Sequence, residues 1–488
     1  MYTLYSEYVF TMISTNDTIC ALATAPGVGG LAVIRVSGPQ AFALVDKLFH
    51  ARTKISDAAS HTIVYGKLRR AVEAEGETEK KVDLPSGHTH SDTLDTVTCS
   101  VFRAPHSYTG EDVVEIGCHG GEVVPQMIIA ALLDVGARLA RPGEFTQRAF
   151  VNGKLDLTQV ESVADLIHAS SEAGARVAGR QLLGAFKENV RSMRSRLIDL
   201  CAFLELELDF AQEDVEFVSR EKLIELIDSV AEFCDNTARG YQASVVLRSG
   251  YKVAFVGKPN AGKSSLYNAL LGFDRSIVHN VAGTTRDYIQ ESVMWDGLRF
   301  QLCDTAGMRT SNDIVEVEGM ERGSAMISES HMIIVVHDFS TEDRDAMKIV
   351  DEIVSTHPHK HVVLVYNKCD VAGSKGLGSS EVSNTIPVIS LSAKTGHNVA
   401  TLREYICRVA RSGSDIATDV LLNDRHMYLL QQTQISLSSA RAALDADAFP
   451  EAIAYELRRA VDTLGEFTGE VINEDIINAV FAGFCIGK

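Results

Sequence analysis

The residue types best suited to chemistry are concentrated in the octet 257–264, which reads Gly-Lys-Pro-Asn-Ala-Gly-Lys-Ser. An apolar run at 253–256 precedes it and a segment with helical apolar spacing follows, so the octet has the strand, turn and helix start that a phosphate-binding P-loop requires. The glycines let backbone N–H groups converge on phosphate oxygens at a helix N-terminus. We therefore expect Lys263 to reach the β- and γ-phosphates of a nucleotide and Ser264 to bind Mg²⁺.

Two segments after the octet carry the residue types that hold Mg²⁺ and a γ-phosphate. Residues 304–307, Asp-Thr-Ala-Gly, follow a strand-like run, and Gly307 offers a backbone N–H to the γ-phosphate. Residues 283–287, Gly-Thr-Thr-Arg-Asp, supply Thr285, whose hydroxyl would complete the Mg²⁺ shell only in the triphosphate state. We expect this stretch to be a switch that becomes ordered with the γ-phosphate.

Two later segments indicate which base is bound. Residues 367–370, Asn-Lys-Cys-Asp, follow an apolar strand, and Asp370 can accept both guanine N–H donors, which adenine does not offer. Residues 392–394, Ser-Ala-Lys, add backbone contacts to the guanine oxygen. Together with the three earlier motifs, they predict a GTPase. The residues predicted to bind GTP are Asn260, Ala261, Gly262, Lys263, Ser264, Ser265, Thr284, Thr285, Asp304, Thr305, Ala306, Gly307, Asn367, Lys368, Asp370, Ser392, Ala393 and Lys394.

The group that activates water is less obvious from the residues. Met308 stands where Ras-like proteins carry a water-orienting glutamine, and a thioether cannot orient water. The acidic stretch 313–321 lies on the expected second switch, where a catalytic role and a solvated helix start are equally open. No arginine stands out as a finger for the transition state, but the side-chain oxygen of Asn260 could hold a monovalent cation there.

The composition describes a globular chain with an acidic balance. The 488 residues suggest two to four domains, with 45% hydrophobic and 23% charged residues. No apolar run approaches the roughly 18–20 residues that span a bilayer, and the N-terminus up to about Gly30 has no Lys or Arg, which argues against targeting peptides. Nine cysteines without a C-x-x-C pair indicate reduced thiols. With a net charge of −19, any RNA contact must be local or shared with another subunit.

The elements that must position the motifs divide into mixed and helical regions. Residues from about 17 to 150 alternate short strands, such as 31–36 and 112–116, with Gly/Pro turns. The polar segment from 69 to about 96 is typical of an exposed insertion or hairpin loop. From about Leu155 the pattern becomes helical, and a second helical region covers about 419–480.

One apolar seam in the first helical region predicts a long helix that packs on others. The seam consists of Leu182, Leu183, Phe186, Val190, Met193, Leu197, Leu200, Leu204 and Leu208. No GTPase core needs these helices, so the economical arrangement is a helical domain interrupted by an inserted G domain, with residues 248–250 and 411–414 as connectors.

We therefore predict a multidomain fold, α/β plus all-α. The predicted domains are an N-terminal α+β domain at 1–152, a central helical domain formed by 153–246 and 414–488, and an inserted Ras-like P-loop G domain at 247–413. Residues 1–11 are a dispensable leader if Met12 is the true start.

The end of the sequence, residues 484–488, reads Phe-Cys-Ile-Gly-Lys. A cysteine fourth from the end suggests prenylation, but Gly487 and a terminal Lys488 fit that signal poorly. The residues alone leave two interpretations open. The tail is either a frayed end, or a thiol, an ammonium and a carboxylate delivered to a site.

Several motifs outside the G domain resemble one family. From about Asp17 to Lys488 the chain is similar to the tRNA modification GTPases called MnmE or TrmE. The motifs that carry the resemblance are 25–30, 34–38, 107–112, 119–121, 141–150, 152–157 and 484–488. The departures are the leader, the polar insertion near 70–96, and Cys369, where the family usually has a small residue.

The resemblance implies an N-terminal domain like that of folate-dependent aminomethyltransferases, which binds 5-formyl- or methylene-tetrahydrofolate. The implied folate contacts are Arg35, Glu115, Lys154 and Lys488. Cys485 corresponds to the proposed catalytic thiol of the family. From the residues alone, each charged group is equally well a surface charge and the thiol a buried tail cysteine, and nothing local indicates a depressed thiol pKa.

For hydrolysis, the resemblance implies that Glu316 takes the place left open at Met308 and orients the attacking water through a second water. K⁺ would be held by Asn260, Thr284 and main-chain carbonyls near His279 and Val281. Two G domains would then meet face to face, which makes activation depend on a homodimer.

The function implied is that of a cytoplasmic, K⁺-dependent GTPase that works with an MnmG (GidA)-type flavoprotein, in a heterotetramer whose FAD belongs to the partner. Together they would modify C5 of the wobble uridine, position 34, of certain tRNAs with a tetrahydrofolate one-carbon donor, and the tRNA would be held mainly by the partner. Two alternatives remain: a ribosome-assembly GTPase that acts as a binding switch, and a folate aminomethyltransferase regulated by GTP. The glycine and arginine motifs of the N-terminal region and the Cys-Ile-Gly-Lys tail argue against the ribosome-assembly alternative.

Overall fold

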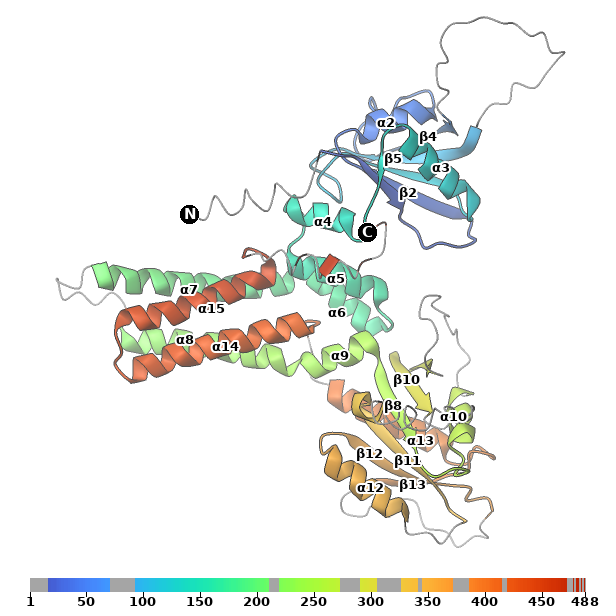
Figure 1. Ribbon diagram of the computed structural model, residues 1–488, viewed down its shortest axis with the longest axis vertical. Coiled ribbons are helices and arrows are strands. Elements are labelled where there is room, and N and C mark those ends of the chain that lie inside the picture. Colours follow the sequence, from blue (N-terminus) through green and yellow to red (C-terminus); the bar gives the residue numbers. More distant parts are fainter. Residues whose placement is uncertain are drawn as a thin grey trace, which may run out of the picture. The chain divides into compact units, whose positions relative to one another are not determined.

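A computed structural model places most of the chain in two compact units (Figure 1). One unit contains residues 1–164 together with 462–488, and the other contains residues 165–461. The structure describes residues 16–70, 93–209, 219–272, 290–304, 326–340, 345–371, 386–414 and 419–471, and the single residues 477, 480, 481, 484 and 487. The domain boundaries predicted from the sequence stay a prediction.

The first unit is built on a seven-stranded sheet in the order β3-β4-β5-β6-β2-β1-β7. All pairings are antiparallel except that of β1 with β7. The strands are β1 (Ile19–Leu22), β2 (Leu31–Ser37), β3 (Phe49–His50), β4 (Thr62–Arg69), β5 (Thr93–Phe102), β6 (Val113–His119) and β7 (Arg138–Leu139). The helices are α2 (Ala41–Leu48), α3 (Val123–Asp134) and α4 (Glu144–Val151). The strands expected at 31–36 and 112–116 are thus confirmed, with small shifts at their ends.

Alternation along β2 decides which side chains face the core of this unit. Ala32, Ile34 and Val36 are buried in the core that α2 and α3 cover, so the residues between them lie on the opposite face of the sheet. Arg35 is one of these, and the β2–β6 register places it directly opposite Glu115. The polar insertion joins β4 to β5, which are paired antiparallel, and its residues 71–92 lie outside the described part.

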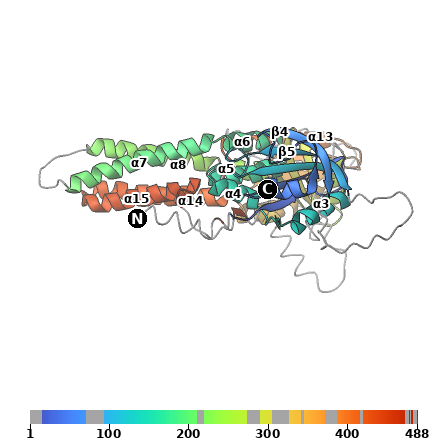
Figure 2. The same ribbon diagram turned by 90° about the horizontal axis from the view of Figure 1, so that it is seen from above.

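The second unit contains long helices that lie side by side (Figures 1 and 2). The helical elements outside the G-domain sheet are α5 (Leu157–His168), which begins in the first unit, α6 (Glu172–Leu182), α7 (Ala185–Asp209), α8 (Arg220–Arg239), α9 (Tyr241–Ser249), α14 (Asp424–Asp445) and α15 (Pro450–Thr468), which ends in the first unit. Ion pairs join neighbouring helices, such as Arg441 of α14 with Asp228 of α8 at 2.8 Å.

The seam predicted as one long helix is wrong at its start. α6 ends at Leu182 and α7 begins at Ala185, because Gly184 has a φ of +94°, which a continuous right-handed helix cannot contain. Leu183, expected in the seam, is 88% exposed. The remainder of the seam behaves as predicted where its side chains are described, with buried residues at Phe186, Val190, Leu197, Leu200 and Leu204.

The G-domain sheet has six strands in the order β13-β12-β11-β8-β10-β9. Only β9 and β10 pair antiparallel. The strands are β8 (Tyr251–Val256), β9 (Gln290–Trp295), β10 (Leu298–Asp304), β11 (Met332–Asp338), β12 (His361–Asn367) and β13 (Val388–Ser390), and the helices are α10 (Lys263–Leu271), α12 (Asp345–Thr356) and α13 (Val399–Ser414). The carboxyl ends of the parallel strands meet at one edge, where open α/β sheets bind ligands.

The expected connectors of this domain are helix ends instead. Residues 248–249 finish α9 and residues 411–414 finish α13. Leu247 of α9 packs into the core of the G domain, so the helix runs directly up to the sheet without a separate linker. Among all described helices, none combines the length and the apolar character needed to cross a bilayer.

Candidate functional site

The P-loop predicted from the octet has the required geometry. It joins β8 to α10, and Gly262 at the start of the helix has a left-handed backbone with a φ of +90°. A Cβ on Gly262 would lie 2.2 Å from the side-chain nitrogen of Asn367, so only glycine fits between the helix start and the guanine motif. Gly262, which caps α10, has no side chain to accept a hydrogen bond from the first backbone N–H groups of the helix.

Lys263 and Ser264, the first two residues of α10, make polar contacts with the P-loop and with the end of β10. Lys263 is buried, and its ammonium donates to the carbonyl oxygens of Gly257 and Lys258, both at 2.8 Å. The hydroxyl of Ser264 donates to the carboxylate of Asp304 at 2.8 Å. A hydroxyl beside a buried carboxylate provides the oxygen ligands that suit Mg²⁺. Ser265, also predicted to bind GTP, follows in the same helical turn and is exposed.

Asn367 joins three of the predicted motifs. Its amide nitrogen donates to the carbonyl oxygen of Ala261 in the P-loop at 3.0 Å, and its amide oxygen accepts from the backbone N–H of Ala393 at 3.0 Å. In the same region, the hydroxyl of Ser392 donates to Asp370 at 2.6 Å, and this hydrogen bond lowers the pKa of Asp370. Asp370 is therefore a carboxylate at neutral pH, which is the form that accepts guanine N–H groups.

Lys368 connects the guanine motif to the P-loop and to Asp338, a residue that no sequence motif indicates. Its ammonium donates to the carbonyl oxygen of Asn260 and to the carboxylate of Asp338, both at 2.7 Å. Asp338 is the last residue of β11 and has no motif around it, so only the strand pairing reveals it. Lys394, the last residue of the Ser-Ala-Lys motif, is exposed.

Several predicted residues cannot be located. Lying outside the described part of the chain are His279, Val281, Thr284, Thr285, Thr305, Ala306, Gly307, Glu316, Cys485 and Lys488. The assignments to the switches and to the tail thiol therefore stay predictions, as do those to the K⁺ ligands, including Asn260.

Two of the predicted folate residues, Arg35 and Glu115, meet on the face of the N-terminal sheet opposite the core that α2 and α3 cover. The Nε and Nη2 atoms of Arg35 lie 2.9 and 2.8 Å from one carboxylate oxygen of Glu115. The guanidinium carbon lies 4.9 Å from the ring centre of Tyr108 and 5.5 Å from that of Phe145. The Nη1 atom is buried and has no hydrogen-bond partner among the described residues. The rings of Tyr108 and Phe145, which we call the aromatic platform, thus hold the guanidinium of Arg35, and its Nη1 group can still donate to a ligand.

Lys154, the third predicted folate residue, lies beside the loop that carries Tyr108. Its ammonium donates to the carbonyl oxygen of Pro105 at 3.0 Å. The amide nitrogen of Asn152 binds the carbonyl oxygen of Thr109 in the same loop at 2.7 Å. The structure therefore places Lys154 on the segment that follows α4 and next to the loop whose ring covers Arg35.

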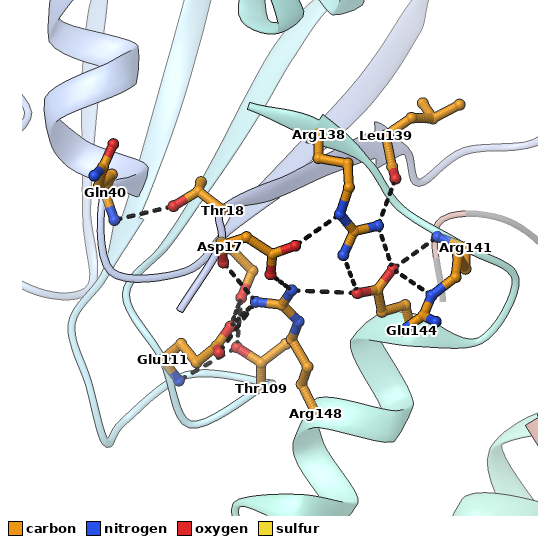
Figure 3. A network of polar contacts seen from close by, with 11 residues as sticks. Asp17, Thr18, Gln40, Thr109, Glu111, Arg138, Leu139, Arg141, Glu144 and Arg148 are labelled. Carbon is orange, nitrogen blue, oxygen red and sulfur yellow. Dashed lines mark hydrogen bonds and ion pairs between the residues drawn. The ribbon is translucent and has the colours of Figure 1, made fainter. Parts of the chain in front are cut away.

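An ionic network that sequence reasoning missed supports this platform (Figure 3). Its centre is Arg148, whose side chain is fully buried and binds Asp17 at 2.6 Å, and Glu111 and Glu144 at 3.2 Å each. Arg138 also binds Asp17, at 2.7 Å. The arginines lie in or near the motif at 141–150, but Asp17 and Glu111 come from distant parts of the sequence. The charges could therefore be noticed, but their pairing could not be predicted.

The network fixes the two chain segments that carry the aromatic rings. Glu111 closely follows Tyr108, and Glu144 directly precedes Phe145. Burial by itself would raise the pKa of Glu144, but hydrogen bonds from Arg138 and from the backbone of Arg141 outweigh it and lower the pKa to about 2. Glu144 is 1% exposed, so its charge depends on these partners.

Described residues of the C-terminal tail lie against the same unit. Phe484 is buried with its ring centre 5.7 Å from that of Phe481, which in turn lies 6.5 Å from that of Phe150 on α4. Gly487 has a φ of +103°, and a Cβ there would lie 2.1 Å from the carbonyl oxygen of Leu22 at the end of β1. Of the two interpretations of the tail, a frayed end is wrong for these residues, because Phe481 and Phe484 are buried and Gly487 lies against the end of β1.

The G-domain sheet, the P-loop and the guanine motif together define a P-loop protein that binds guanine nucleotides, joined in one chain to helices and an α+β unit. The model for the MnmE helical domain matches residues 157–485, and the model for the GTP-binding protein TrmE N-terminus matches residues 18–154. The chain belongs to the MnmE family of tRNA modification GTPases. The resemblance, the fold class and the enzyme class predicted from the sequence are thereby confirmed.

Curated relatives match over nearly their whole length. The tRNA modification GTPase MnmE of Salinibacter ruber is 37% identical over 98% of this chain and 100% of its own. That of Chlorobium luteolum is 39% identical over 96% of this chain and 97% of its own. Among solved structures, the G domain of the T. maritima FeoB iron transporter matches with 28% identity over 33% of this chain and 98% of its own, at a TM-score of 0.25.

Proposed function

We propose that this protein hydrolyses GTP in a K⁺-dependent way and works with an MnmG (GidA)-type flavoprotein on certain tRNAs. Together they add an aminomethyl or carboxymethylaminomethyl group to C5 of the wobble uridine, position 34, with a tetrahydrofolate as one-carbon donor. The protein acts in the cytoplasm as a homodimer, within a heterotetramer whose FAD belongs to the partner. Residues 1–152 bind folate, residues 247–413 bind GTP, and residues 153–246 and 414–488 form the helical domain.

The observation that carries the proposal is the contact made by Asn367. One amide side chain binds both Ala261 of the P-loop and Ala393 of the Ser-Ala-Lys motif. Phosphate and base are therefore recognised at positions fixed relative to each other. The carboxylate of Asp370 then accepts the guanine N–H donors, which selects GTP over ATP.

The cation site rests on Asn260. Its backbone is left-handed, with a φ of +63°, and Lys368 holds its carbonyl oxygen, so its side chain is carried on a fixed turn of the P-loop. The other ligands in the proposal are Thr284 and the carbonyl oxygens of His279 and Val281. The positive charge that K⁺ supplies beside the phosphates does the electrostatic work of an arginine finger. Glu316 orients the attacking water.

The folate site rests on Arg35. Its Nη1 atom is a buried donor that no described residue pairs, and an anionic or carbonyl oxygen of a folate would satisfy it. The Glu115 carboxylate accepts N–H donors from the pterin ring of the folate. Lys154 and Lys488 add positive charge that attracts the anionic end of the folate. When bound, the folate supplies the one-carbon unit. The thiol of Cys485 is the proposed catalytic group of the tail.

Nucleoside analysis of tRNA tests the function as a whole. In a strain that lacks this gene, the C5 substituent of the wobble uridine should be absent, and plasmid-borne wild-type protein should restore it. A ribosome-assembly GTPase would instead leave the wobble uridine modified and change the ribosomal subunit profile. An intact C5 substituent in the deletion strain overturns the proposal.

The hydrolytic part is tested by the GTPase rate measured against K⁺ and against protein concentration. The rate per protein should rise with concentration, because two G domains must meet, and should fall sharply when NaCl replaces KCl. Equal rates in both salts would remove Asn260 from its proposed role. A rate per protein that does not depend on concentration would contradict a dimerisation-dependent step in this range.

A further inference from the structure

Asp338 lies at the site by virtue of strand pairing alone. It is the last residue of β11, and the parallel register places it opposite Asn367, the last residue of β12. The backbone N–H of Phe339 donates to the carbonyl oxygen of Asn367 at 2.8 Å, which closes the two strand ends together. The Asp338 carboxylate therefore lies at the same edge of the sheet as Lys368, which belongs to the guanine-recognition turn at 367–370.

The two oxygens of this carboxylate have separate partners. One accepts from the ammonium of Lys368 at 2.7 Å, and the other accepts from the hydroxyl and the backbone N–H of Ser340 at 2.7 and 3.0 Å. Burial would raise the pKa of Asp338, but the hydrogen bonds from Lys368 and Ser340 outweigh it and lower the pKa to about 2. The group is an anion at every working pH, so its bond to Lys368 is charge-assisted.

Lys368 passes this constraint on to the P-loop. The same ammonium donates to the carbonyl oxygen of Asn260 at 2.7 Å. Both residues have left-handed backbones, with φ values of +68° for Lys368 and +63° for Asn260. Such conformations cost a non-glycine residue on the order of 1 kcal/mol and persist when surrounding contacts hold them. The ammonium of Lys368 therefore links its own strained turn to the strained turn at Asn260, and the carboxylate of Asp338 orients that ammonium.

We propose that Asp338 is a positioning residue that couples the guanine-recognition turn to the P-loop through Lys368. Its carboxylate holds the ammonium of Lys368 over the carbonyl oxygen of Asn260, so the P-loop keeps the conformation in which phosphate and cation are bound. The coupling to nucleotide binding stands on the described contacts. The coupling to the cation rests on the proposed role of Asn260 in binding K⁺.

The test uses the full-length protein with Asp338→Asn, which keeps the shape of the side chain and removes its charge. We expect the dissociation constant for GDP to rise about tenfold, since losing a hydrogen bond between charged groups costs roughly 1.5 kcal/mol at its lower limit. The K⁺ concentration for half-maximal GTPase rate should rise as well. The matched control is Asp351→Asn, which removes the same charge from an exposed position of α12 and should change neither value.

A double-mutant cycle separates positioning from a general loss of stability. Lys368→Met removes the group through which Asp338 acts, so adding Asp338→Asn to it should change GDP affinity by less than twofold. Independent effects of the two substitutions would overturn the proposal, as would an unchanged GDP affinity in Asp338→Asn alone. If K⁺ fails to activate the wild-type protein, the cation part of the proposed function fails, while the GDP measurements still decide the role of Asp338.

Discussion

Arg148 offers a sharp test of whether buried charge pairing stabilises the N-terminal unit. Its side chain is fully buried against Glu144, whereas Arg141, 64% exposed, binds the same carboxylate from the surface. Arg148→Met keeps much of the apolar stem but takes the central partner from the buried Glu144 and from the partly exposed Asp17 and Glu111, which costs about 3–5 kcal/mol. Arg141→Met removes an exposed pair worth about 0–1 kcal/mol.

The pKa of Glu144 reports how strongly all the partners of this carboxylate together stabilise its charge, with Arg138 and the backbone of Arg141 contributing more than Arg148. The pKa falls from 4.5 in the unfolded chain to about 2 in the folded protein. This shift corresponds to about 3 kcal/mol of stability. Because the folded pKa is depressed, that stability is present above pH 4.5 and is lost as the pH falls towards 2. The N-terminal unit of the wild-type protein should therefore lose stability over this range.

The measurement must report on one unit at a time. Hydrogen exchange read by mass spectrometry on peptides from β1, β2 and α4, over a urea series, gives the opening free energy of the N-terminal sheet. The single tryptophan, Trp295, is buried in the G domain, so its fluorescence follows the other unit and should be unchanged in both variants. If Arg148→Met and Arg141→Met destabilise the N-terminal sheet equally, the reasoning from burial is refuted.

Three further outcomes are expected. Glu316→Ala should abolish GTP turnover while sparing GTP binding, measured by single-turnover hydrolysis and nucleotide titration, and K⁺-stimulated turnover at the wild-type rate would refute its assignment. Asp370→Asn should weaken GDP binding by about a hundredfold and improve binding of xanthosine diphosphate, because an amide can donate where guanine required an acceptor. Gly487→Ala should weaken folate binding in equilibrium dialysis, because its Cβ would meet the Leu22 carbonyl oxygen at 2.1 Å, and unchanged affinity would contradict a role for the docked tail.

The nucleotide motifs could be predicted because their physics is local. A few neighbouring residues are enough to indicate each of these motifs, whether glycines at fixed spacing, a helix start or an Asn-Lys-Cys-Asp turn. The break between α6 and α7 is also local, but apolar spacing does not register it. The spacing of Leu183 matches that of the other apolar residues in the seam. The helix ends before the left-handed backbone of Gly184, and Leu183 is exposed to solvent.

The partners of charged residues could not be predicted, because they depend on pairing between distant segments. Asp338 meets Lys368 only after β11 and β12 align in parallel. Arg148 collects carboxylates from the start of β1 and from the loop before β6, which lie far from it in sequence. A single sequence contains these charges but no signal for which of them will meet.

The contact between Gly487 and Leu22 has a consequence for how the chain matures during synthesis. Strand β1 leaves the ribosome early, whereas the glycine that packs on its carbonyl oxygen emerges only after almost all of the printed sequence. The end of β1 therefore lacks its contact with Gly487 while the whole nucleotide-binding unit is made. A nascent polypeptide stalled before Gly487 would contain a G domain that can fold and an N-terminal sheet without the contact between Gly487 and Leu22.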